Sequence, residues 1–379
     1  MRNNFVFLDS TQNYPLEFSA GNSKVELISK GLLNFNRKVY VINSFWGCNK
    51  IKKECIGENK GISYRLYPKN GKMGYLYNLF RIFTLLFALR KDYKYVIITS
   101  NHFIVYVLEC LWMKILGYKI GVLYHELRHT TLRNPSKYTL YSTKAFDYLF
   151  GYFCDFILPI SHFLEQRCTK FNRPMLLTPI LSVINESLVS KNINDNFLYC
   201  GSLAYKRIIL FILDAFKIFA ETNKALLTLV LYGEQKDMQM IRDMVTEYEL
   251  SDKVLIKEKV PYNELLTLYS ESLALLIPLD KTNTQDKARF SQKIAEYTSV
   301  VRPIITNPVG EVPYYFNSES AYFLDGLDTN KLAKMFEEII SNKEIASEIG
   351  YKGFCVCREF FDNMKYTHSL LNFIKRIYE

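Results

Sequence analysis

A lysine and a glutamate three positions apart are the residues in the second half of the chain whose types and spacing best suit chemistry. Lys293 and Glu296 stand in the segment FSQKIAEYTSVVRPIITNPV, residues 290–309. A spacing of three places two side chains on one face of a helix, so this pair is directed to a single place. A short buried strand is expected at 303–306, directly after the helix. The other interpretation of the pair is an exposed salt bridge on the protein surface.

A strand, a glycine turn and two basic residues in front of a helix form a second candidate site, for phosphate. The segment FLYCGSLAYKRIILFILDAFKIF begins at Phe197 and contains Gly201, Lys206 and Arg207. Backbone N–H groups at a helix N-terminus bind anions, and Lys and Arg side chains add charge-assisted hydrogen bonds. Together these groups could neutralise a diphosphate. Basic residues before a helix are also common as ordinary solvated side chains.

A third group of polar residues follows the apolar run GVLY and reads HELRH over residues 125–129. His125, Glu126 and Arg128 are its candidate site residues. The segment also matches HExxH, a pattern in which two histidines on a helix hold zinc and the glutamate is the base of a metalloprotease. The strand expected before the segment and Pro135 after it disfavour the long helix which that pattern requires.

The composition is that of a chain that folds throughout its length. Its 379 residues are 49% hydrophobic and include 28 Tyr, 27 Phe and 2 Trp. That content excludes low-complexity disorder, and the length predicts about two domains. The eight cysteines lack paired CxxC spacing, so we expect free thiols. The first apolar run is too short for a signal peptide and no stretch has about 18 clean apolar residues, so we expect a cytoplasmic protein without a membrane span.

Short apolar runs alternate with longer amphipathic segments, which predicts an α/β fold of βαβ units. The expected strands are 5–8, 39–42, 96–99, 120–123 and 156–160 in the first half, and 197–200, 227–232, 254–256, 273–277 and 303–306 in the second. The expected helices are 22–33, 209–221, 236–248, 263–270, 291–299, 329–340 and 364–378. A polar stretch with prolines at 172–196 indicates a linker between two domains.

Positive charge is concentrated in the first half of the chain. Residues 1–180 contain 25 Lys and Arg against 11 Asp and Glu, whereas residues 181–379 contain 23 against 27. This asymmetry predicts an anionic partner for the first half. Segment 76–95, LYNLFRIFTLLFALRKDYKY, combines bulky apolar residues with four basic ones, as helices at membrane surfaces do. Because no nucleic-acid motif accompanies it, we expect contact with an anionic membrane and none with nucleic acid, although core packing of this helix is equally compatible.

The signatures of the second half resemble those of a known family. Residues 293–306 follow a pattern of K-x-x-E-Y, a small turn, and proline before a hydrophobic strand. Arg207 follows Gly201 by six positions, and segments 227–234 and 254–279 read as successive strand–turn–helix units. These features are similar to glycosyltransferase family 4, the retaining nucleotide-sugar enzymes of GT-B fold.

The first half resembles the amino-terminal domain of the same family in its segments FSAGNSKVELISKGL, GVLYHELRHTT and ISHFLEQ. The resemblance places Gly21 in the family's glycine loop and His125 at its catalytic-site histidine. Glu126 and Arg128 are then expected, with Gly21, in an acceptor or phosphate loop.

The resemblance implies two Rossmann-like doubly wound domains that face each other across a cleft. Residues 1–180 would form the acceptor-binding domain and residues 181–360 the domain that binds the nucleotide sugar. Residues 361–379 would contain a C-terminal helix that crosses back to the first domain.

The implied activity is transfer of a sugar, of hexosyltransferase type, from a nucleotide diphosphate sugar to an acceptor hydroxyl with retention. Lys206, Arg207 and Lys293 would stabilise the leaving diphosphate, with Gly201 in the same donor site. Glu296 would accept hydrogen bonds from the ribose. The sequence has no D-x-D motif, and the resemblance implies no metal and no other cofactor.

Two positions depart from the family pattern. Ala288 stands where most members carry the first of two glutamates spaced eight apart, and Ser202 stands where an arginine usually follows the turn glycine. These departures put the contact with the donor sugar and part of the contact with the diphosphate in question.

The resemblance implies a glycan or lipid-linked acceptor and a role in surface polysaccharide synthesis, such as lipopolysaccharide, O-antigen or capsule. We expect the protein in the cytoplasm, peripherally at the inner face of the membrane. Two alternatives stay open, a non-catalytic sugar-nucleotide-binding partner subunit and a nucleotide-sugar epimerase of the same fold. The sequence does not identify the base, the sugar, the acceptor or the linkage.

Overall fold

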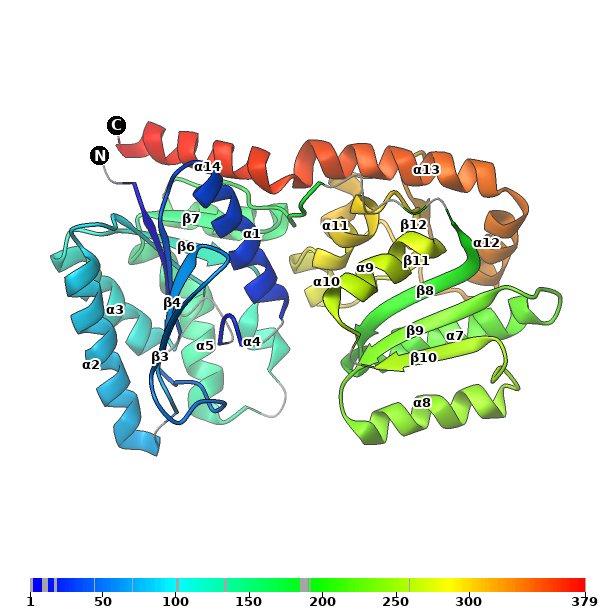
Figure 1. The fold of residues 1–379 in the computed structure, drawn as a ribbon, viewed down its shortest axis with the longest axis horizontal. Coiled ribbons are helices and arrows are strands. Elements are labelled where there is room, and N and C mark those ends of the chain that lie inside the picture. Colours follow the sequence, from blue (N-terminus) through cyan, green and yellow to red (C-terminus); the bar gives the residue numbers. More distant parts are fainter. Residues whose placement is uncertain are drawn as a thin grey trace. The chain divides into compact units, whose positions relative to one another are not determined.

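The structure is a computed structural model of the chain. It describes residues 3–8, 13–16, 19–43, 45–69, 71–99, 102–132, 135–184, 190, 192–258 and 260–378. The chain divides into two compact units (Figure 1). Unit 1 comprises Met1–Leu181, Ala288–Phe290 and Asn363–Glu379, and unit 2 comprises Ser182–Lys287 and Ser291–Asp362. Each unit is a mostly parallel sheet covered by helices, so the expected α/β fold class is confirmed.

Unit 1 is built on a seven-stranded sheet with the order β3-β4-β2-β1-β5-β6-β7. Its strands are β1 (Phe5–Leu8), β2 (Val39–Ile42), β3 (Cys55–Asn59), β4 (Ile62–Leu66), β5 (Tyr95–Ile98), β6 (Lys119–Tyr124) and β7 (Phe156–Pro159). Neighbouring strands run parallel, except that β3 pairs antiparallel with β4. β1, β5 and β7 are short, completely buried apolar runs, as parallel strands covered on both faces must be.

The helices of unit 1 lie on two faces of this sheet. They are α1 (Ala20–Asn34), α2 (Gly71–Leu89), α3 (Phe103–Ile115), α4 (Arg128–Thr131), α5 (Lys137–Leu149), α6 (His162–Cys168) and α14 (Asn363–Tyr378). α1 connects β1 to β2, toward one edge of the sheet, whereas α2, α3 and α5 connect strands that follow one another toward the opposite edge. Because such crossovers are right-handed, α1 packs on one face and α2, α3 and α5 on the other. α14 packs against α1 (Figure 1).

Unit 2 has a six-stranded, fully parallel sheet with the order β10-β9-β8-β11-β12-β13. Its strands are β8 (Asn194–Ser202), β9 (Leu226–Tyr232), β10 (Val254–Glu258), β11 (Ser272–Ile277), β12 (Ile304–Thr306) and β13 (Tyr322–Phe323). Its helices are α7 (Lys206–Ala220), α8 (Gln235–Glu247), α9 (Tyr262–Glu271), α10 (Thr284–Ala288), α11 (Gln292–Ser299), α12 (Thr329–Ser341) and α13 (Lys343–Val356). Phe336 of α12 packs on Phe197 of β8 with ring centroids 4.4 Å apart, which joins helix and sheet in one core.

Each of the ten expected strands corresponds to an observed one, with small differences at the ends. The expected linker at 172–196 was drawn too long, because β8 already begins at Asn194; its residues 185–189 and 191 lie outside the described residues. The expected strands do not include β3, β4 or β13, and the expected helices do not include α3, α4, α5, α10 or α13. β3 is the edge strand of the sheet and β4 lies next to it, and both are partly exposed, so their polar residues interrupt the apolar signal.

Among the described residues, none of the helices combines the length and the apolar character that crossing a membrane requires.

Gly31 allows α1 and α14 to approach closely. A methyl group added at Gly31 would lie 2.0 Å from Thr367 Oγ1 and 3.1 Å from Asn363 O. Thr367 is completely buried, so it has no space to move aside. The packing of α14 on unit 1 therefore depends on the missing side chain at this position.

We predict that Gly31→Ala lowers the free energy of unfolding by about 1–3 kcal/mol, because overpacking forces the two helices apart. Chemical denaturation measures the change. Lys30→Ala on the same helix is the matched control and should stay within about 0.5 kcal/mol of the wild type. A Gly31→Ala protein as stable as the wild type contradicts the close-packing account.

Candidate active site

The strand order of unit 2 reverses its direction between β8 and β11. From β8 the chain adds β9 and β10 on one side, and from β11 it adds β12 and β13 on the other. The connections that leave β8 and β11 therefore go to opposite faces of the sheet. Ligands of open α/β sheets bind at the carboxyl end of the strands at such a point. The short 3-10 helix Leu203–Tyr205 follows β8 there, and loop 278–283 follows β11.

Two cations stand at the start of α7, directly after the short 3-10 helix. Arg207 Nη1 lies 2.7 Å from Asp280 Oδ2, so an ion pair joins the start of α7 to loop 278–283, and the Arg207 side chain is 74% exposed. Hydrogen bonds from Thr282, together with the charge of Arg207, lower the pKa of Asp280. Lys206 forms an ion pair with Asp237 in the first turn of α8. Carboxylates thus hold the predicted phosphate-binding cations in place, and an incoming phosphate would have to compete with them.

Lys293 and Glu296 both lie in α11, as their spacing predicts. Glu296 is buried, and burial raises its pKa to about 7, although the charge of Lys293 lowers it. Lys293 Nζ donates to Tyr232 Oη at 3.3 Å. Burial lowers the pKa of Lys293, but Tyr232, Cys200 and Glu296 together raise it above its ordinary value. An exposed surface salt bridge does not describe a pair whose carboxylate is buried.

Tyr297 fixes α11 to the strand ends at the switch point. Its hydroxyl oxygen accepts the Cys200 N–H at 3.1 Å, and its ring meets that of Tyr269 edge-on at 4.7 Å. Burial raises the pKa of both tyrosines well above the ordinary value, so both remain neutral. Because Cys200 belongs to β8, this bond sets the position of Lys293 and Glu296 relative to the start of α7.

Gly201 lies within β8, one residue before its end, and not in a turn. A Cβ at this position would lie 2.2 Å from Tyr199 Oη, because the Tyr199 side chain covers the glycine. Ser202, which stands in place of the family's arginine, accepts the Ala204 N–H at 3.2 Å and so shapes the loop that follows. Packing of the Tyr199 side chain therefore explains why residue 201 is a glycine. The contact of Gly201 with a donor stays a prediction.

The loop after β12 contains two residues that the sequence reasoning missed. The Asn307 side chain accepts the Leu279 N–H at 2.8 Å and donates to the carbonyl oxygens of Leu324 and Gly326, both at 2.8 Å. It thus ties the ends of three neighbouring strands together. Gly310 has φ +60°, and a Cβ there would lie 2.4 Å from the backbone oxygen of Asp286 in α10. The sequence contains a signal for these two residues, namely a polar residue directly after a buried strand with a glycine shortly after it.

Ala288 occupies the position of the absent family glutamate and is completely buried. Its carbonyl oxygen accepts a hydrogen bond from Ser161 Oγ at 2.5 Å. Asp286 lies two residues earlier and is also buried, and its carboxylate accepts the Asp280 N–H at 3.0 Å. Asp286 therefore supports the loop after β11, and the candidate site has no carboxylate at position 288.

In unit 1, His125 directly follows β6 at the carboxyl edge of the sheet. Burial lowers its pKa, and the charges of Lys24 and Arg128 lower it further. Glu126 and a hydrogen bond with the Leu123 backbone act in the opposite direction but are weaker in total. His125 is therefore mainly neutral at neutral pH, and a neutral imidazole can both donate and accept a hydrogen bond.

Lys24 of α1 is a buried cation that the sequence reasoning did not single out. The residue is 4% exposed, and its Nζ donates to Thr178 O at 3.3 Å. Burial lowers the pKa of Lys24 to about 7. A buried ionisable group with a strongly shifted pKa beside His125 is itself a candidate site residue. Nothing in its sequence surroundings distinguishes it from Lys30 on the same helix.

Of the other predicted residues of unit 1, Gly21 follows β1, whereas Glu126 and Arg128 follow β6 as His125 does. Gly21 is in the first turn of α1 and not in the loop before it. Glu126 is partly exposed between β6 and α4, and Arg128 is the first residue of α4. These positions agree with the carboxyl edge of the sheet, and the ligand roles of these residues stay predictions.

The structure contradicts the metalloprotease interpretation of HELRH. His125 lies outside any helix, and α4 contains only the last part of the motif. His129 Nδ1 lies 2.5 Å from Asp147 Oδ2, so its partner is a carboxylate. No cluster of three or more His, Cys, Asp and Glu side chains that could hold a metal ion occurs within the described residues.

We predict that Lys24→Met stabilises the protein at pH 6. The Lys24 pKa falls from 10.5 to about 7 on folding, so the folded state binds this proton less tightly than the unfolded state. The stability that this group contributes is complete above pH 10.5 and is lost as the pH falls through 7. At ~1.4 kcal/mol per pKa unit, the variant should gain a few kcal/mol at pH 6, less ~1 kcal/mol for the lost hydrogen bond.

Thermal or urea unfolding at pH 6 and pH 9 measures this effect, and the gain should shrink at the higher pH. Lys30→Met is the matched control, because Lys30 is partly exposed and paired with Glu26. A Lys24→Met protein less stable than the wild type at both pH values contradicts the burial account.

Three comparisons with known proteins bear on these sites. Residues 184–354 match the model of the family described as "Glycosyl transferases group 1". A comparison with curated proteins gives no significant match.

Solved structures match over nearly the whole chain. Sucrose-phosphate synthase from Thermosynechococcus elongatus has a TM-score of 0.74 at 14% identity, with 99% of each chain covered. HepE from Anabaena, in complex with UDP-glucose, has a TM-score of 0.71 at 13% identity, with 98% of this chain and 99% of that chain covered. TarM has a TM-score of 0.72 at 11% identity, with 98% of this chain and 99% of that chain covered. At these identities the likeness shows the fold, which is GT-B. The fold of the chain and the family match of residues 184–354 together support a group 1 glycosyltransferase.

Proposed function

We propose that the chain is a retaining glycosyltransferase of family 4 that transfers a sugar from a nucleoside diphosphate sugar to an acceptor hydroxyl. One observation carries this proposal. Lys206, Arg207, Lys293 and the buried Glu296 stand at or beside the switch point of the sheet within the segment that matches group 1 glycosyltransferases. A separate acceptor group, His125, lies at the corresponding edge of the other sheet.

The cations suit the charge that develops during transfer. Breaking the glycosidic C–O bond leaves the electron pair on the diphosphate and positive charge on the sugar. Fixed cations directed at the phosphates therefore stabilise the transition state more than the ground state. Arg207 and Lys206 are not buried, so phosphate oxygens can reach them and replace their carboxylate partners. The N-terminus of α7, where both residues stand, adds backbone N–H donors.

The nucleotide that we propose is UDP. HepE from Anabaena has been solved with UDP and with UDP-glucose, and the pneumococcal O-GlcNAc transferase GtfA with UDP and GlcNAc. These ligands are known for those proteins, and the shared fold is the reason to test them on this chain. The sugar of the donor remains open, because Ala288 replaces a carboxylate that usually contacts it.

Glu296 is proposed to accept hydrogen bonds from the two ribose hydroxyls. Only the ionised carboxylate accepts both without donating, and burial holds the pKa of Glu296 at about 7. Nucleotide binding should therefore favour the ionised form and strengthen as the pH rises through neutrality. Lys293, whose charge acts on Glu296, is placed to favour that same form.

The acceptor is proposed to be a glycan or a lipid-linked glycan from which a surface polysaccharide is built. The transfer to it is proposed to take place in the cytoplasm. His125 would hydrogen-bond a hydroxyl of the donor sugar or orient the acceptor, which suits its neutral imidazole. Glu126, Arg128 and Gly21 would line the same region. We propose that the reaction requires no metal ion, because the cations of the chain are assigned to the phosphates.

A non-catalytic sugar-nucleotide-binding subunit is the second candidate, and the buried Ala288 favours it. The two candidates differ in turnover but not in nucleotide binding. Hydrolysis of UDP-glucose, in which water accepts the glucosyl group and UDP leaves, therefore separates them.

We predict that the wild type binds UDP-glucose up to about tenfold more weakly at pH 6 than at pH 8, because a group with a pKa of about 7 is mostly protonated at pH 6. Glu296→Gln should bind about as weakly as the protonated wild type and lose the pH dependence. Isothermal titration calorimetry with EDTA present measures both. UDP-glucose is preferred over UDP because its phosphates do not titrate in this range.

Glu337→Gln on the exposed side of α12 is the matched control and should keep both affinity and pH dependence. Equal affinity of the wild type at pH 6 and pH 8, with Glu296→Gln unchanged, would remove Glu296 from the donor site.

We predict that His125→Ala lowers the rate at which UDP-glucose is hydrolysed to UDP and glucose at least tenfold, while the dissociation constant and the melting temperature stay near those of the wild type. A coupled UDP assay and a thermal shift measure these quantities. His162→Ala at the start of α6 serves as the control histidine. Equal rates for His125→Ala and wild type contradict the catalytic assignment, and an inactive wild type that binds UDP-glucose favours the non-catalytic subunit.

A further inference from the structure

α2 presents a continuous apolar stripe away from the sheet of unit 1. Ile82 and Leu86 face the core and are completely buried. The opposite side of the helix carries large hydrophobic side chains that are at least 49% exposed, namely Leu76, Tyr77, Phe80 and Phe87. Their spacing of about one turn places them along one line. α2 is therefore apolar on both sides, which core packing alone does not explain.

α3 carries a second such stripe beside the first. Ile104, Leu108, Leu111 and Ile115 recur every three or four residues and are between 46% and 76% exposed. Phe83 of α2 stacks on Trp112 of α3 at 5.5 Å, and Trp112 Nε1 donates to Phe83 O at 3.1 Å. These contacts hold the two helices side by side, as Figure 1 also shows. The two stripes therefore form one surface.

α5 extends this surface on the far side of α3. The Phe103 N–H of α3 donates to Ser142 Oγ of α5 at 3.0 Å, and the Tyr106 and Phe146 rings meet edge-on at 5.0 Å. The exposed large side chains of α5 are Tyr138, Tyr141, Tyr148 and Leu149. We call the exposed side chains of α2, α3 and α5 together the helical face of unit 1.

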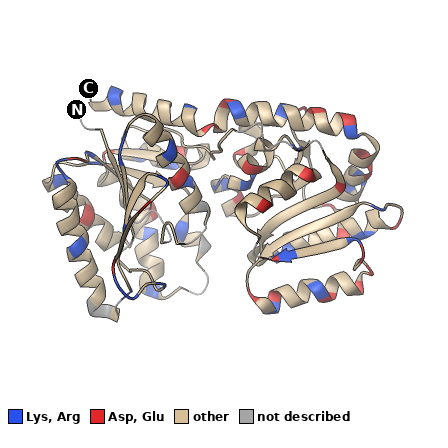
Figure 2. Cartoon of the chain, viewed as in Figure 1, with Lys and Arg blue, Asp and Glu red and all other residues tan. Residues whose placement is uncertain are grey.

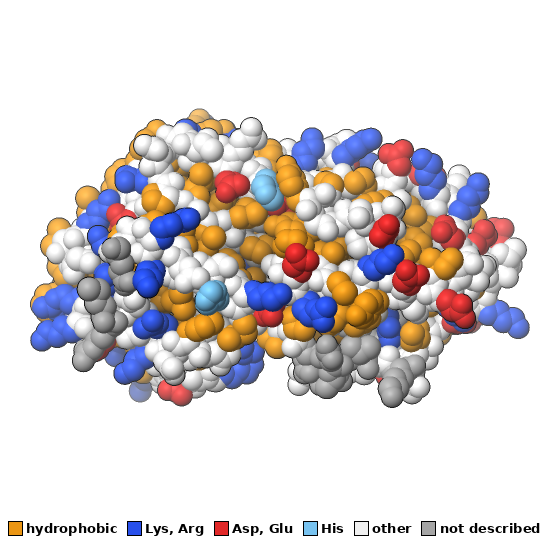
Figure 3. Space-filling model, turned by 90° about the horizontal axis from the view of Figure 1, so that it is seen from above, with side chains coloured by type: hydrophobic (Ala, Val, Ile, Leu, Met, Phe, Trp, Pro, Cys, Tyr) orange, Lys and Arg blue, Asp and Glu red, His pale blue; other side chains and the backbone are white. Residues whose placement is uncertain are grey.

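The helical face differs from the surface of unit 2. Among the described residues, each of α2, α3 and α5 exposes four large hydrophobic side chains, whereas no helix of unit 2 exposes more than two. Scattered exposed hydrophobic residues are ordinary, but a contiguous apolar surface marks an interaction site. In the view from above, Figure 3 shows hydrophobic side chains interspersed with charged ones over both sides of the molecule.

The exposed charges of the three helices are positive. Lys114, Lys137 and Lys144 are exposed, while the acidic residues Glu109 and Asp147 are buried. In unit 2, by contrast, acidic and basic residues alternate along helices such as α8 and α13 (Figure 2). The helical face is thus apolar along its centre and basic among and around its apolar residues.

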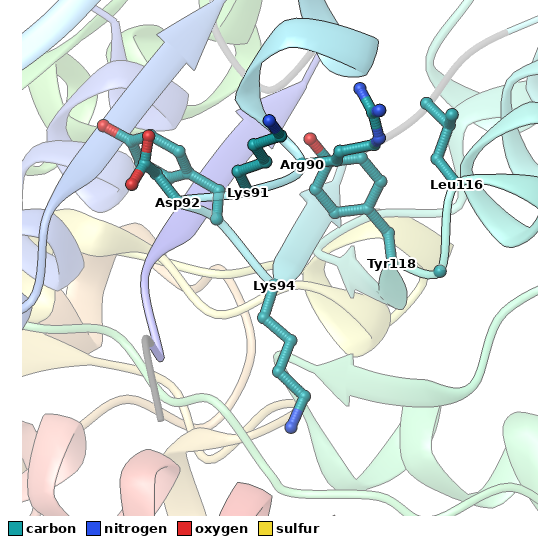
Figure 4. A pocket seen from close by; sticks show the side chains of 8 residues that line it. Arg90, Lys91, Asp92, Lys94, Leu116 and Tyr118 are labelled. Carbon is teal, nitrogen blue, oxygen red and sulfur yellow. The ribbon is translucent and has the colours of Figure 1, made fainter.

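The C-terminal ends of α2 and α3 add a basic pocket of about 350 Å³. Arg90, Lys91, Lys94 and Tyr118 line it, together with Asp92. Figure 4 shows Lys94 extending away from Arg90 and Lys91. The Arg90 guanidinium lies 3.5 Å from the centre of the Phe87 ring, so the pocket adjoins the apolar stripe of α2 directly.

We propose that the helical face of unit 1 docks on the surface of a lipid bilayer rich in anionic lipids. Leu, Ile, Phe and Tyr side chains of interfacial helices insert at the boundary between headgroups and acyl chains, and flanking Lys and Arg attract the anionic headgroups. Arg90, Lys91 and Lys94 are assigned to phosphate groups of the lipids at one end of the face. This surface lies outside the candidate active site, so the inference does not depend on the proposed reaction.

Charge favours a bilayer over a second copy of the chain as the occupant. A two-fold dimer would pair the same face of two copies, and the lysines of one copy would meet those of the other. Desolvating like charges against each other is unfavourable, whereas anionic headgroups neutralise them. The buried acids Glu109 and Asp147 offer no compensating negative charge at this surface.

Sedimentation of the full chain with vesicles tests the proposal. We expect binding to vesicles of phosphatidylcholine with 30% phosphatidylglycerol, about tenfold weaker binding to phosphatidylcholine alone, and weakening with salt. The double variant Phe80→Glu with Leu108→Glu should reduce the partition coefficient on anionic vesicles at least tenfold. Lys91→Glu with Lys114→Glu should reduce it on anionic vesicles only.

Matched controls carry the same changes elsewhere. Leu226→Glu with Ile345→Glu replaces hydrophobic residues of unit 2 that are 45% and 53% exposed, and should bind vesicles as the wild type does. Lys365→Glu with Lys375→Glu changes charges on α14, on the other face of the unit 1 sheet, and should also leave binding unchanged. Circular dichroism and UDP-glucose binding confirm that each variant is folded.

Three results would overturn the proposal. One is absence of wild-type binding to anionic vesicles. Another is equal loss of binding in the control variants, which would mean that any added negative charge suffices. The third is a wild-type dimer in analytical ultracentrifugation that Phe80→Glu with Leu108→Glu dissociates, which would make a second copy the occupant. Loss of UDP-glucose binding with intact vesicle binding would instead contradict the proposed donor site alone.

Discussion

The reversal of strand order between β8 and β11 is the constraint on which the candidate donor site depends. Right-handed connections from these two neighbours must leave toward opposite faces, so the start of α7 and the loop before α10 are brought to one point of the sheet edge. The ion pair of Arg207 with Asp280 spans that point. Tyr297 then ties α11 to β8 through the Cys200 N–H, which brings Lys293 and the buried Glu296 to the same strand ends. The sheet topology therefore determines where the charged residues of this site lie, and the charges of these residues determine which ligand they can bind.

Two buried ionisable groups with pKa values near 7 stand at the sheet edges, one in each unit. Burial raises the pKa of Glu296 and lowers that of Lys24, so each group disfavours its charged form at neutral pH. The stability that Glu296 contributes is complete below the pKa of Glu296 in the unfolded chain and is lost as the pH rises through 7. The stability that Lys24 contributes is lost as the pH falls through 7. A chain selected only for stability would replace both with apolar residues. Both groups lie beside the predicted donor and acceptor positions. Their loss of folding stability therefore agrees with a role in ligand binding.

Much of the fold could be predicted from the sequence, because buried parallel strands are uninterrupted apolar runs that any reading of hydrophobicity finds. β3 and β4 were not predicted, because both strands are partly exposed and polar residues interrupt their apolar runs. Lys293 and Glu296 were found through helical spacing, which is a local property. Gly201 was selected as a turn glycine, but Tyr199 is the reason that no side chain fits there. Lys24 could not be identified, since its burial results from packing between segments distant in the sequence.

Hydrogen–deuterium exchange with and without UDP-glucose tests the central claim most directly, because it locates the donor as well as detecting it. The account predicts slower exchange in peptides that cover residues 199–207 and 291–299, where β8 meets α7 and where α11 lies. Exchange in α12 should stay unchanged. Protection confined to other parts of the chain, or none at a UDP-glucose concentration that saturates binding, would contradict the assignment of the donor site to the switch point of unit 2.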